Sequence, residues 1–418
     1  MRQLPLERRL LLKAGLAALL GLTGHAALAD ILETGDPDAN GGASDGLKPA
    51  QLRLGKDLIR ILAGRRKSDA GADNFVASPA SLAAILAFVD MGASRPLRSA
   101  IHRVLGFRRA AKADRDLRAL RTGVSAVIAR SGKDGPLALA NLLAFDRSAR
   151  PRQMALYALS GAGADVLVDD LGDAKIIGRI NAWVRQKTHD LIPSIIEEAP
   201  ESLGLVAINA LYFKDRWQIP FDPVRTESVK FQVFSGAPVD VPMMHSGVRK
   251  FRFRQDDRFI AAELAYAHED FRLVVITTRS EPAAPSDFAA VSGWLGGEEF
   301  AAASGEIALP KLRLSATEEL LSPLDALGLS PARLARDALD GFSPESLAIT
   351  RVVQKLELRL DEEGTEAAAA TAVVTTRSVH VDDHVRMVVD KPFVFALRDE
   401  KSGLILLMGY VGRPASGA

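Results

Sequence analysis

The chain of 418 residues contains no cysteine. It can therefore form neither disulfides nor thiolate metal sites, and in an oxidising compartment its stability must come from packing alone. An excess of charge of one sign is also missing, because 53 lysines and arginines nearly balance 52 aspartates and glutamates. This balance gives no case for nucleic acid as a partner or for a stable association with an anionic membrane.

Motifs of familiar enzyme chemistry are absent as well. The sequence has no H-E-x-x-H pair and no glycine-rich phosphate loop. Its G-x-S-x-G pattern, Gly42–Gly46, lies in a polar stretch without the preceding strand and following helix that a nucleophile elbow needs. His380 and His384 are the one histidine pair near ligand spacing, and the aspartates between them favour a solvated loop tip over a metal site. We expect a protein that is not an enzyme and that needs no metal or cofactor.

Apolar residues are plentiful enough for a sizeable core, and no linker rich in Pro, Gly or Ser interrupts residues 50–414. Helical periodicity dominates residues 50–150 and includes a helix over 78–92, with Pro79 suited to its first turn. Helices first and strands later predict an α+β domain with large mixed or antiparallel sheets. The strand-like runs are 204–213, 229–234, 258–264, 272–278, 306–313, 347–358 and 404–411.

Residues 1–29 have the features of an export signal. Arg8 and Arg9 precede an apolar run, Leu10–Leu28, and a small-x-small cleavage site ends at Ala29. The spacing to Lys13 favours a twin-arginine signal, and general secretion stays open as the alternative. A retained membrane anchor is disfavoured because the run is interrupted by polar and small residues. We expect a periplasmic or extracellular protein.

Residues 30–48 are mostly turn formers without periodicity, which predicts a flexible leader. A single domain over residues 49–418 would follow this leader.

The most informative stretch is residues 361–371, Asp-Glu-Glu-Gly-Thr-Glu-Ala-Ala-Ala-Ala-Thr. An acidic turn and a glycine precede small residues that bury little area and would make a poor core. Residues 371–376 then change to strand-favouring types. The pattern favours a segment that waits at the surface and later slides between existing strands, rather than an alanine-rich linker.

Several apolar segments with polar residues at fixed places are spread over most of the chain. Met387–Leu397 holds the block Asp390-Lys391-Pro392-Phe393 and is followed by Gly403–Pro414. Earlier in the chain come Asn74–Ser81, Ile180–Thr188, Asn209–Asp222, Val241–Met244 and Leu309–Lys311. Together and in this order, these segments resemble those of the serpins, the serine protease inhibitors with a mobile reactive-centre loop.

The resemblance implies a large central, mainly antiparallel sheet, two further sheets, about nine helices and an exposed loop over about residues 362–384. Trp217 would pack where that loop enters the sheet. Many serpins have a histidine at the position of Gln354, and a glutamine does not titrate, so pH-dependent opening is not expected. The sheet-opening residues would be Ser78, Pro79, Ser81, Asn209 and Gln354.

The loop's hinge, in the same resemblance, starts with an acidic pair and a glycine that can bend because it has no Cβ. Side chains alternate along a strand. Thr365 and every second residue after it would face the core, and the charged Glu366 would face outward. This favours an inhibitor over a non-inhibitory serpin that acts as a binding module. The hinge residues would be Glu362, Glu363, Gly364, Thr365, Glu366, Ala367, Ala368, Ala369, Ala370 and Thr371.

The scissile bond stays open. The usual count from the hinge glycine gives Ser378–Val379, whereas the need of trypsin-like proteases for a long cation favours Arg377–Ser378. We favour Arg377 and a trypsin-like serine protease as partner. Cleavage after Ser378, or at Val374, Thr375 or Thr376, would instead mean an elastase- or subtilisin-like target.

A basic run lies in the helical N-terminal region, where some serpins bind sulfated polysaccharides. Asp114 and Asp116 dilute its charge, which favours an ordinary solvated face. Polyanion binding is therefore a weakly supported expectation, and we expect a monomer. The basic residues are Arg103, Arg108, Arg109, Lys112, Arg115, Arg118 and Arg121.

Overall fold

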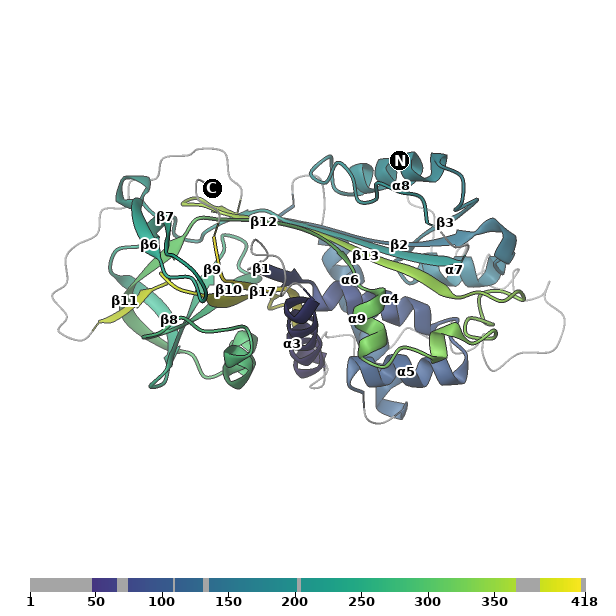
Figure 1. Ribbon diagram of the computed structural model, residues 1–418, viewed down its shortest axis with the longest axis horizontal. Helices are drawn as coiled ribbons and strands as arrows, with labels where there is room; N and C mark the ends of the chain where they lie inside the picture. The colour runs from purple at the N-terminus through teal and green to yellow at the C-terminus, as the bar shows by residue number, and fades with distance from the viewer. Residues whose placement is uncertain are drawn as a thin grey trace, which may run out of the picture. The chain divides into compact units, whose positions relative to one another are not determined.

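Helices dominate the first part of the chain and strands the rest (Figure 1). The structure, a computed structural model, describes residues 47–65, 74–107, 110–130, 135–200, 204–365 and 384–414. The first elements are α3 (Leu47–Arg65), β1 (Asn74–Ala77), α4 (Pro79–Asp90), α5 (Arg95–Leu105), α6 (Ala110–Arg130), β2 (Leu137–Asp146), α7 (Gln153–Gly161), β3 (Asp165–Asp169) and α8 (Lys175–Lys187).

The strand-rich part begins with β4 (Leu205–Phe213) and the short β5 (Asp215–Arg216). Next along the chain come β6 (Glu227–Phe231), β7 (Val239–His245), β8 (Arg249–Gln255), β9 (Phe259–Ala265) and β10 (Phe271–Thr278). The 3-10 helix η3 (Asp287–Gly296), β11 (Ala301–Pro310) and β12 (Leu312–Glu319) follow. The last elements are α9 (Leu321–Ala326), β13 (Ile349–Leu360), β14 (Gly364–Thr365), β15 (Val385–Val388), β16 (Phe393–Asp399) and β17 (Leu404–Val411). The α+β class expected from the sequence is confirmed.

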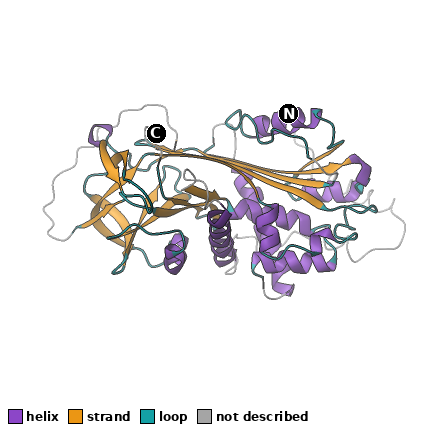
Figure 2. Cartoon of the chain, viewed as in Figure 1, coloured by secondary structure: helices purple, strands orange, loops and turns teal. Residues whose placement is uncertain are grey.

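A five-stranded sheet, in the order β12-β13-β4-β2-β3, lies between two helical layers (Figures 1 and 2). Helix α8 covers one face, where Ile176, Ile180 and Val184 pack on apolar residues of β2 and β4. The other face packs on α4 and the main core. The strands β13 and β4 run parallel, while β12–β13 and β4–β2 are antiparallel.

Strand β2 corrects the prediction that helical periodicity would extend through residue 150. Its sequence, LALANLLAFD, is rich in good helix formers. All ten of its residues are buried, because both faces of this central strand are covered. A strand that is buried on both faces reads as a continuous apolar run, which periodicity cannot distinguish from a buried helix.

Helix α4 confirms the helix predicted over residues 78–92. Ser78 is its N-cap, with the side chain accepting a hydrogen bond from the Ser81 N–H, and Pro79 occupies the first turn. Every residue of α4 is buried. The start of α3 at Leu47 shows that the predicted leader was too long, since residues 47 and 48 are helical.

The larger sheet has ten strands, in the order β1-β17-β16-β10-β9-β8-β11-β7-β6, with β15 paired to β11. All its pairs are antiparallel except β11–β15. Helix α3 and η3 pack on its apolar face. The third sheet consists of β14 and β5 alone.

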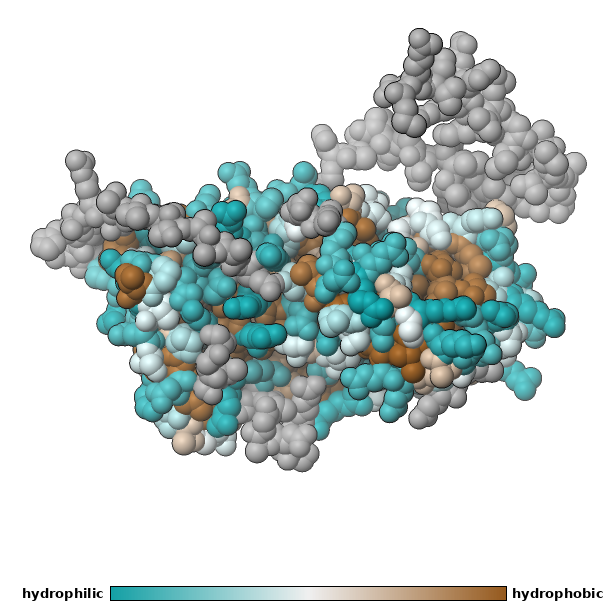
Figure 3. Space-filling model, turned by 90° about the horizontal axis from the view of Figure 1, so that it is seen from above, coloured by the Kyte–Doolittle hydropathy of each residue, from teal (hydrophilic) through white to brown (hydrophobic). Residues whose placement is uncertain are grey.

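The surface seen in Figure 3 is a mixture of polar areas and separate apolar patches. The most exposed large apolar side chains are Val224, Met154 and Tyr157. Among the described residues, none of the helices combines the length and apolar character that crossing a membrane requires.

Candidate sheet-opening site and loop hinge

The middle of the five-stranded sheet contains the predicted sheet-opening residues. Strand β13 is hydrogen-bonded directly to β4, with residues from Ile349 to Leu358 opposite Leu205 to Phe213. No other strand separates them over this length. Gln354 lies opposite Asn209 in this parallel pair, and Asn141 of β2 lies opposite Asn209 on its other side.

These amides meet the start of α4 in one buried network. The Ser78 N–H donates to Gln354 Oε1 at 2.8 Å, and Gln354 Nε2 donates to Ser78 O at 3.3 Å and Asn209 Oδ1 at 3.4 Å. Ser78 Oγ is 2.7 Å from Ser81 Oγ. We call Ser78, Ser81, Gln354, Asn209 and Asn141 the amide cluster. It links α4 to three strands without a formal charge.

Asn141 is the member of the cluster that the sequence analysis missed. Its Oδ1 accepts a hydrogen bond from Asn209 Nδ2 at 2.9 Å, while its own buried Nδ2 has no partner. A lone asparagine within the apolar run of β2 is the signal that could have found it. Pro79 lies in the first turn of α4. Its side chain has no hydrogen-bonding group, so its part is to fix the start of the helix that carries Ser78 and Ser81.

The predicted hinge follows the C-terminal end of β13. After β13 ends at Leu360, the chain turns, and Gly364 and Thr365 form β14, which pairs antiparallel with β5, just beyond the end of β4. Asp215 of β5 accepts hydrogen bonds from His268 Nδ1 at 2.8 Å and from the His268 N–H at 3.2 Å. Because they pair with β5, Gly364 and Thr365 are already arranged as a strand next to the end of β4.

Thr365 is fully buried, and its Oγ1 lies 2.9 Å from the Tyr266 hydroxyl. Burial raises the pKa of Tyr266, so its hydroxyl stays protonated. The Tyr266 ring stacks on Trp217 with centroids 4.5 Å apart. Tyr266 had no signal in the sequence, because it contacts the hinge from a strand end about a hundred residues away.

Trp217 anchors the turn that precedes β14. Its indole Nε1 donates to Asp361 O at 2.9 Å, and its N–H donates to Glu363 O at 2.8 Å. The Phe221 N–H donates to Glu362 O at 2.8 Å. Trp217 thus lies where the sequence predicted contact with the loop.

The Glu362 carboxylate is held by two partners. Lys311 Nζ lies 2.8 Å from one oxygen, and Thr226 Oγ1 donates to the other at 2.7 Å. Burial alone would raise the pKa of Glu362, but the hydrogen bonds from Lys311 and Thr226 and the lysine charge outweigh it, so the pKa lies below its ordinary value. We call Trp217, Phe221, Thr226, Tyr266 and Lys311 the hinge anchor.

Gly364 has a φ of +153°, which L side chains rarely adopt. A Cβ at this position would lie 2.1 Å from Asp215 O. Asp361 accepts hydrogen bonds from the Glu363 and Gly364 N–H groups, and burial nevertheless raises the pKa of its carboxyl. The close approach of two backbones explains the glycine.

The rest of the predicted loop lies outside the described residues. This applies to Glu366, Ala367, Ala368, Ala369, Ala370 and Thr371 of the hinge and to the reactive-bond residues Arg377 and Ser378. His380 also lies there. Of the basic run, Arg103, Arg115 and Arg118 are exposed, whereas Arg121 is partly buried and donates to Ala87 O.

Comparisons with known proteins agree with this geometry. Residues 51–414 match the family model described as "Serpin (serine protease inhibitor)". The chain is 31% identical to Serpin-ZX of Hordeum vulgare over 88% of this chain and 97% of that one, and 28% identical to the leukocyte elastase inhibitor of Bos taurus over 88% and 99%. The solved structure of Serpin48 from Tenebrio molitor superposes with a TM-score of 0.75 at 23% identity, over 90% of this chain and all of that one.

Proposed function

Because the chain belongs to the serpin family, most of whose members are protease inhibitors and not enzymes, we propose that it is an irreversible suicide-substrate inhibitor of serine proteases. The observation that supports this most is β14. Its two residues, Gly364 and Thr365, already form a strand beyond the C-terminal end of the parallel β13–β4 pair. Loop insertion in serpins is a known example of strand addition and of stored strain. The question here is whether this chain can perform it.

The topology favours insertion. Because β14 runs antiparallel to β5, a continued strand would run antiparallel to both β4 and β13. Insertion would replace one parallel interface by two antiparallel ones, which are slightly more stable per residue and add a full ladder of hydrogen bonds. The uninserted form would be metastable, and its lifetime would be a kinetic quantity.

The length of β13 fits the predicted loop. The strand has 12 residues, and twelve residues counted from Thr365 end at Thr376. An inserted strand matching β13 would therefore end directly before Arg377. Cleavage after Arg377 or Ser378 leaves this strand whole, whereas cleavage at Val374 or Thr375 would shorten it.

In the proposed inhibitory step, this geometry would be used as follows. The protease serine attacks the scissile carbonyl carbon, the peptide C–N bond breaks, and an ester joins the enzyme to the new C-terminus of the loop. Insertion of about twelve residues at roughly 3.4 Å each would move the acyl-enzyme by about 40 Å. A displacement of about 1 Å in a catalytic site can cost on the order of a hundredfold in rate, so deacylation would stop.

Formation of a complex with trypsin tests the proposal. We expect an SDS-stable band and, after cleavage of the loop alone, a marked rise in the midpoint of thermal unfolding. Complete turnover of the loop with an unchanged or lower midpoint would refute inhibition and place the protein among the non-inhibitory members.

We propose Arg377–Ser378 as the reactive bond, on the chemistry of trypsin-like specificity. Arg377→Ala should lower the association rate with trypsin by orders of magnitude, because the acidic specificity pocket of the protease is left unpaired. Mass spectrometry of the released C-terminal peptide identifies the bond. A peptide that starts at Ser378 supports Arg377, and one that starts at Val379 refutes it.

We also propose that the protein is exported, because of the signal features in residues 1–29. N-terminal sequencing of the exported protein should find Asp30 first. Replacement of Arg8 and Arg9 by lysine should block export if the twin-arginine pathway is used. Normal export of the double variant would favour general secretion instead.

A further inference from the structure

The ten-stranded sheet has a wedge-shaped opening between β8 and β9. On one side, β8 pairs with β11 from Arg249 to Phe253. On the other side, pairing with β9 begins only at Arg252. The segment Trp217–Phe221 fills part of the gap, where the Gln218 N–H donates to Ala265 O at 2.9 Å. A cavity of about 260 Å³ remains between these three segments.

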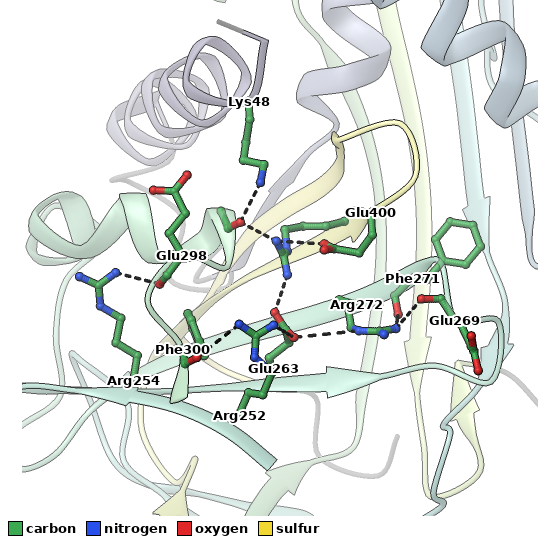
Figure 4. Close-up of polar contacts among 12 residues, drawn as sticks. Lys48, Arg252, Arg254, Glu263, Glu269, Phe271, Arg272, Glu298, Phe300 and Glu400 are labelled. Carbon is green, nitrogen blue, oxygen red and sulfur yellow. Dashed lines mark hydrogen bonds and ion pairs between the residues drawn. The ribbon is translucent and has the colours of Figure 1, made fainter. Parts of the chain in front are cut away.

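Cations line this cavity in excess. Arg249, Lys250, Arg252 and Arg272 line it together with one carboxylate, that of Glu263. Glu263 is already engaged: Arg252 Nη1 lies 2.9 Å from it, Arg272 Nε 4.0 Å, and Arg398 contacts its other oxygen (Figure 4). Within the described part of the chain, neither Arg249 nor Lys250 has a carboxylate partner.

Arg249 is the cation of this cavity that has a buried nitrogen without a hydrogen bond to the described residues. Its Nη1 donates to Ile219 O at 2.9 Å and to Pro220 O at 3.2 Å, while its buried Nε has no hydrogen-bond partner among the described residues. Burial lowers its pKa to about 10, so it is still a cation at neutral pH. A partly buried guanidinium without a counter-ion carries a desolvation cost, and a bound anion would offset it.

The remaining walls are aromatic. Trp217, Phe221 and Phe251 line the cavity, and the Arg249 guanidinium lies 5.3 Å and 5.0 Å from the ring centroids of Phe221 and Phe251. The volume lies just below the usual range for ligand pockets, about 300–1,000 Å³, so the site suits a small ligand. A flat apolar ring could lie among these side chains while its acidic group meets the Arg249 guanidinium.

We propose that this wedge binds a small organic anion with a flat apolar body, such as an aromatic carboxylate. The site also adjoins the loop, because Trp217 and Phe221 are members of the hinge anchor. Their N–H groups hold Glu363 O and Glu362 O. A ligand that fixes these two residues therefore stabilises the uninserted hinge. A consequence for inhibitor lifetime rests on the proposed function, whereas binding and hinge protection do not.

Titration of the full chain with 1-naphthoate tests the site, with 1-naphthamide as the neutral analogue of equal size. We expect calorimetric binding of the carboxylate and at least about tenfold weaker binding of the amide, because a charge-assisted hydrogen bond is lost. Equal binding of both compounds, or no binding of either, would overturn the proposal.

Three variants locate the binding. Arg249→Gln removes the charge, and Ala302→Leu fills the cavity while Arg249 stays in place. Each should weaken 1-naphthoate binding at least about tenfold. Arg254→Gln is the matched control, because it is an arginine of the same strand that stacks on Trp294, 4.5 Å away, and does not line the cavity. An equal loss in this control, or unchanged binding to Ala302→Leu, would refute the assignment.

Hydrogen exchange tests the link to the hinge independently of inhibition. Saturating 1-naphthoate should slow exchange of the Trp217 and Phe221 amides, since exchange requires opening of their bonds to the hinge. Unchanged exchange at these amides would disprove the coupling and leave a ligand site that does not affect the loop.

Discussion

The amide cluster and the hinge anchor differ in what they hold: the cluster ties β13 and β4 to α4, and the anchor holds the turn that follows β13. In mid-sheet, β13 and β4 are joined by a continuous ladder, and neutral amides tie them to α4. After the C-terminal end of β13, the chain forms a turn, which is held by an ion pair, an indole and backbone hydrogen bonds. One region closes the sheet, and the other positions the segment that would open it.

The difference indicates where insertion would begin. The hinge anchor already places Thr365 in a strand position, so the first inserted residue needs little movement. Every later residue must displace hydrogen bonds between β13 and β4, and the amide cluster lies on that path. We therefore infer that the cluster contributes to the kinetic barrier, while the anchor sets the starting register.

The largest expected effect is that of Thr365→Arg. Its side chain would have to replace one that is fully buried against Tyr266, and the carboxylate of Asp215, which is paired with Thr365, is already hydrogen-bonded to His268. Titration of trypsin should give cleavage of the loop with complete turnover and no covalent complex. Glu366→Arg, on the predicted outward face, is the control and should still inhibit. Stoichiometric trapping by Thr365→Arg would show that the register is wrong.

Removing the centre of the amide cluster should have the next largest effect. Gln354→Ala leaves the buried Ser78 N–H without its acceptor, which should cost about 2–3 kcal/mol in the stability of the closed sheet. Thermal unfolding of the uncleaved protein measures this. Lys355→Ala, one position along the same strand and partly exposed, should change little. Equal effects in both variants would contradict a special role for the cluster.

Gly364→Ala tests the backbone of the hinge. The φ of +153° and the contact of the new Cβ with Asp215 O should strain the uninserted form by about 1–3 kcal/mol. An extended inserted strand carries no such strain, so the half-life of the active form should fall roughly 5- to 100-fold. Gly123→Ala, in the interior of α6 with room for a Cβ at 3.6 Å, is the control. An unchanged half-life for Gly364→Ala would show that β14 is not retained in solution.

The smallest effect is expected at the ion pair. Because the folded-state pKa of Glu362 is lowered, its contribution is present above its unfolded pKa of about 4.3 and is lost as the pH falls through the folded value. Lys311→Met should cost about 1–2 kcal/mol at pH 7 and remove this acid dependence, as melting curves from pH 3 to 7 would show. Lys230→Met, whose pair with Asp240 is exposed on both sides, should leave the curves nearly unchanged. An acid dependence in Lys311→Met like that of the parent would assign it to other carboxylates.

Much of this arrangement could be predicted from the sequence. The helix α4 with its Ser78 cap, the strands β4, β9, β10 and β17, and the α+β class follow from local patterns. Strand β2 could not be predicted, because its leucines and alanines suit a helix as well as a doubly buried strand. The predicted sheet-opening residues and Trp217 came from the family resemblance. The structure adds the contacts that these residues make, which a resemblance does not give.

By itself, the sequence determined the run of small residues after Gly364 and the order of the segments that identify the family. Only the tertiary structure decided that Gln354 faces Ser78, that Tyr266 meets Thr365, and that Arg249 lacks a counter-ion in the wedge. The physical reason is that each of these contacts joins residues that are distant in the chain. Local patterns fix the face on which a side chain lies, while its partner depends on how the strands are ordered and registered in the sheets.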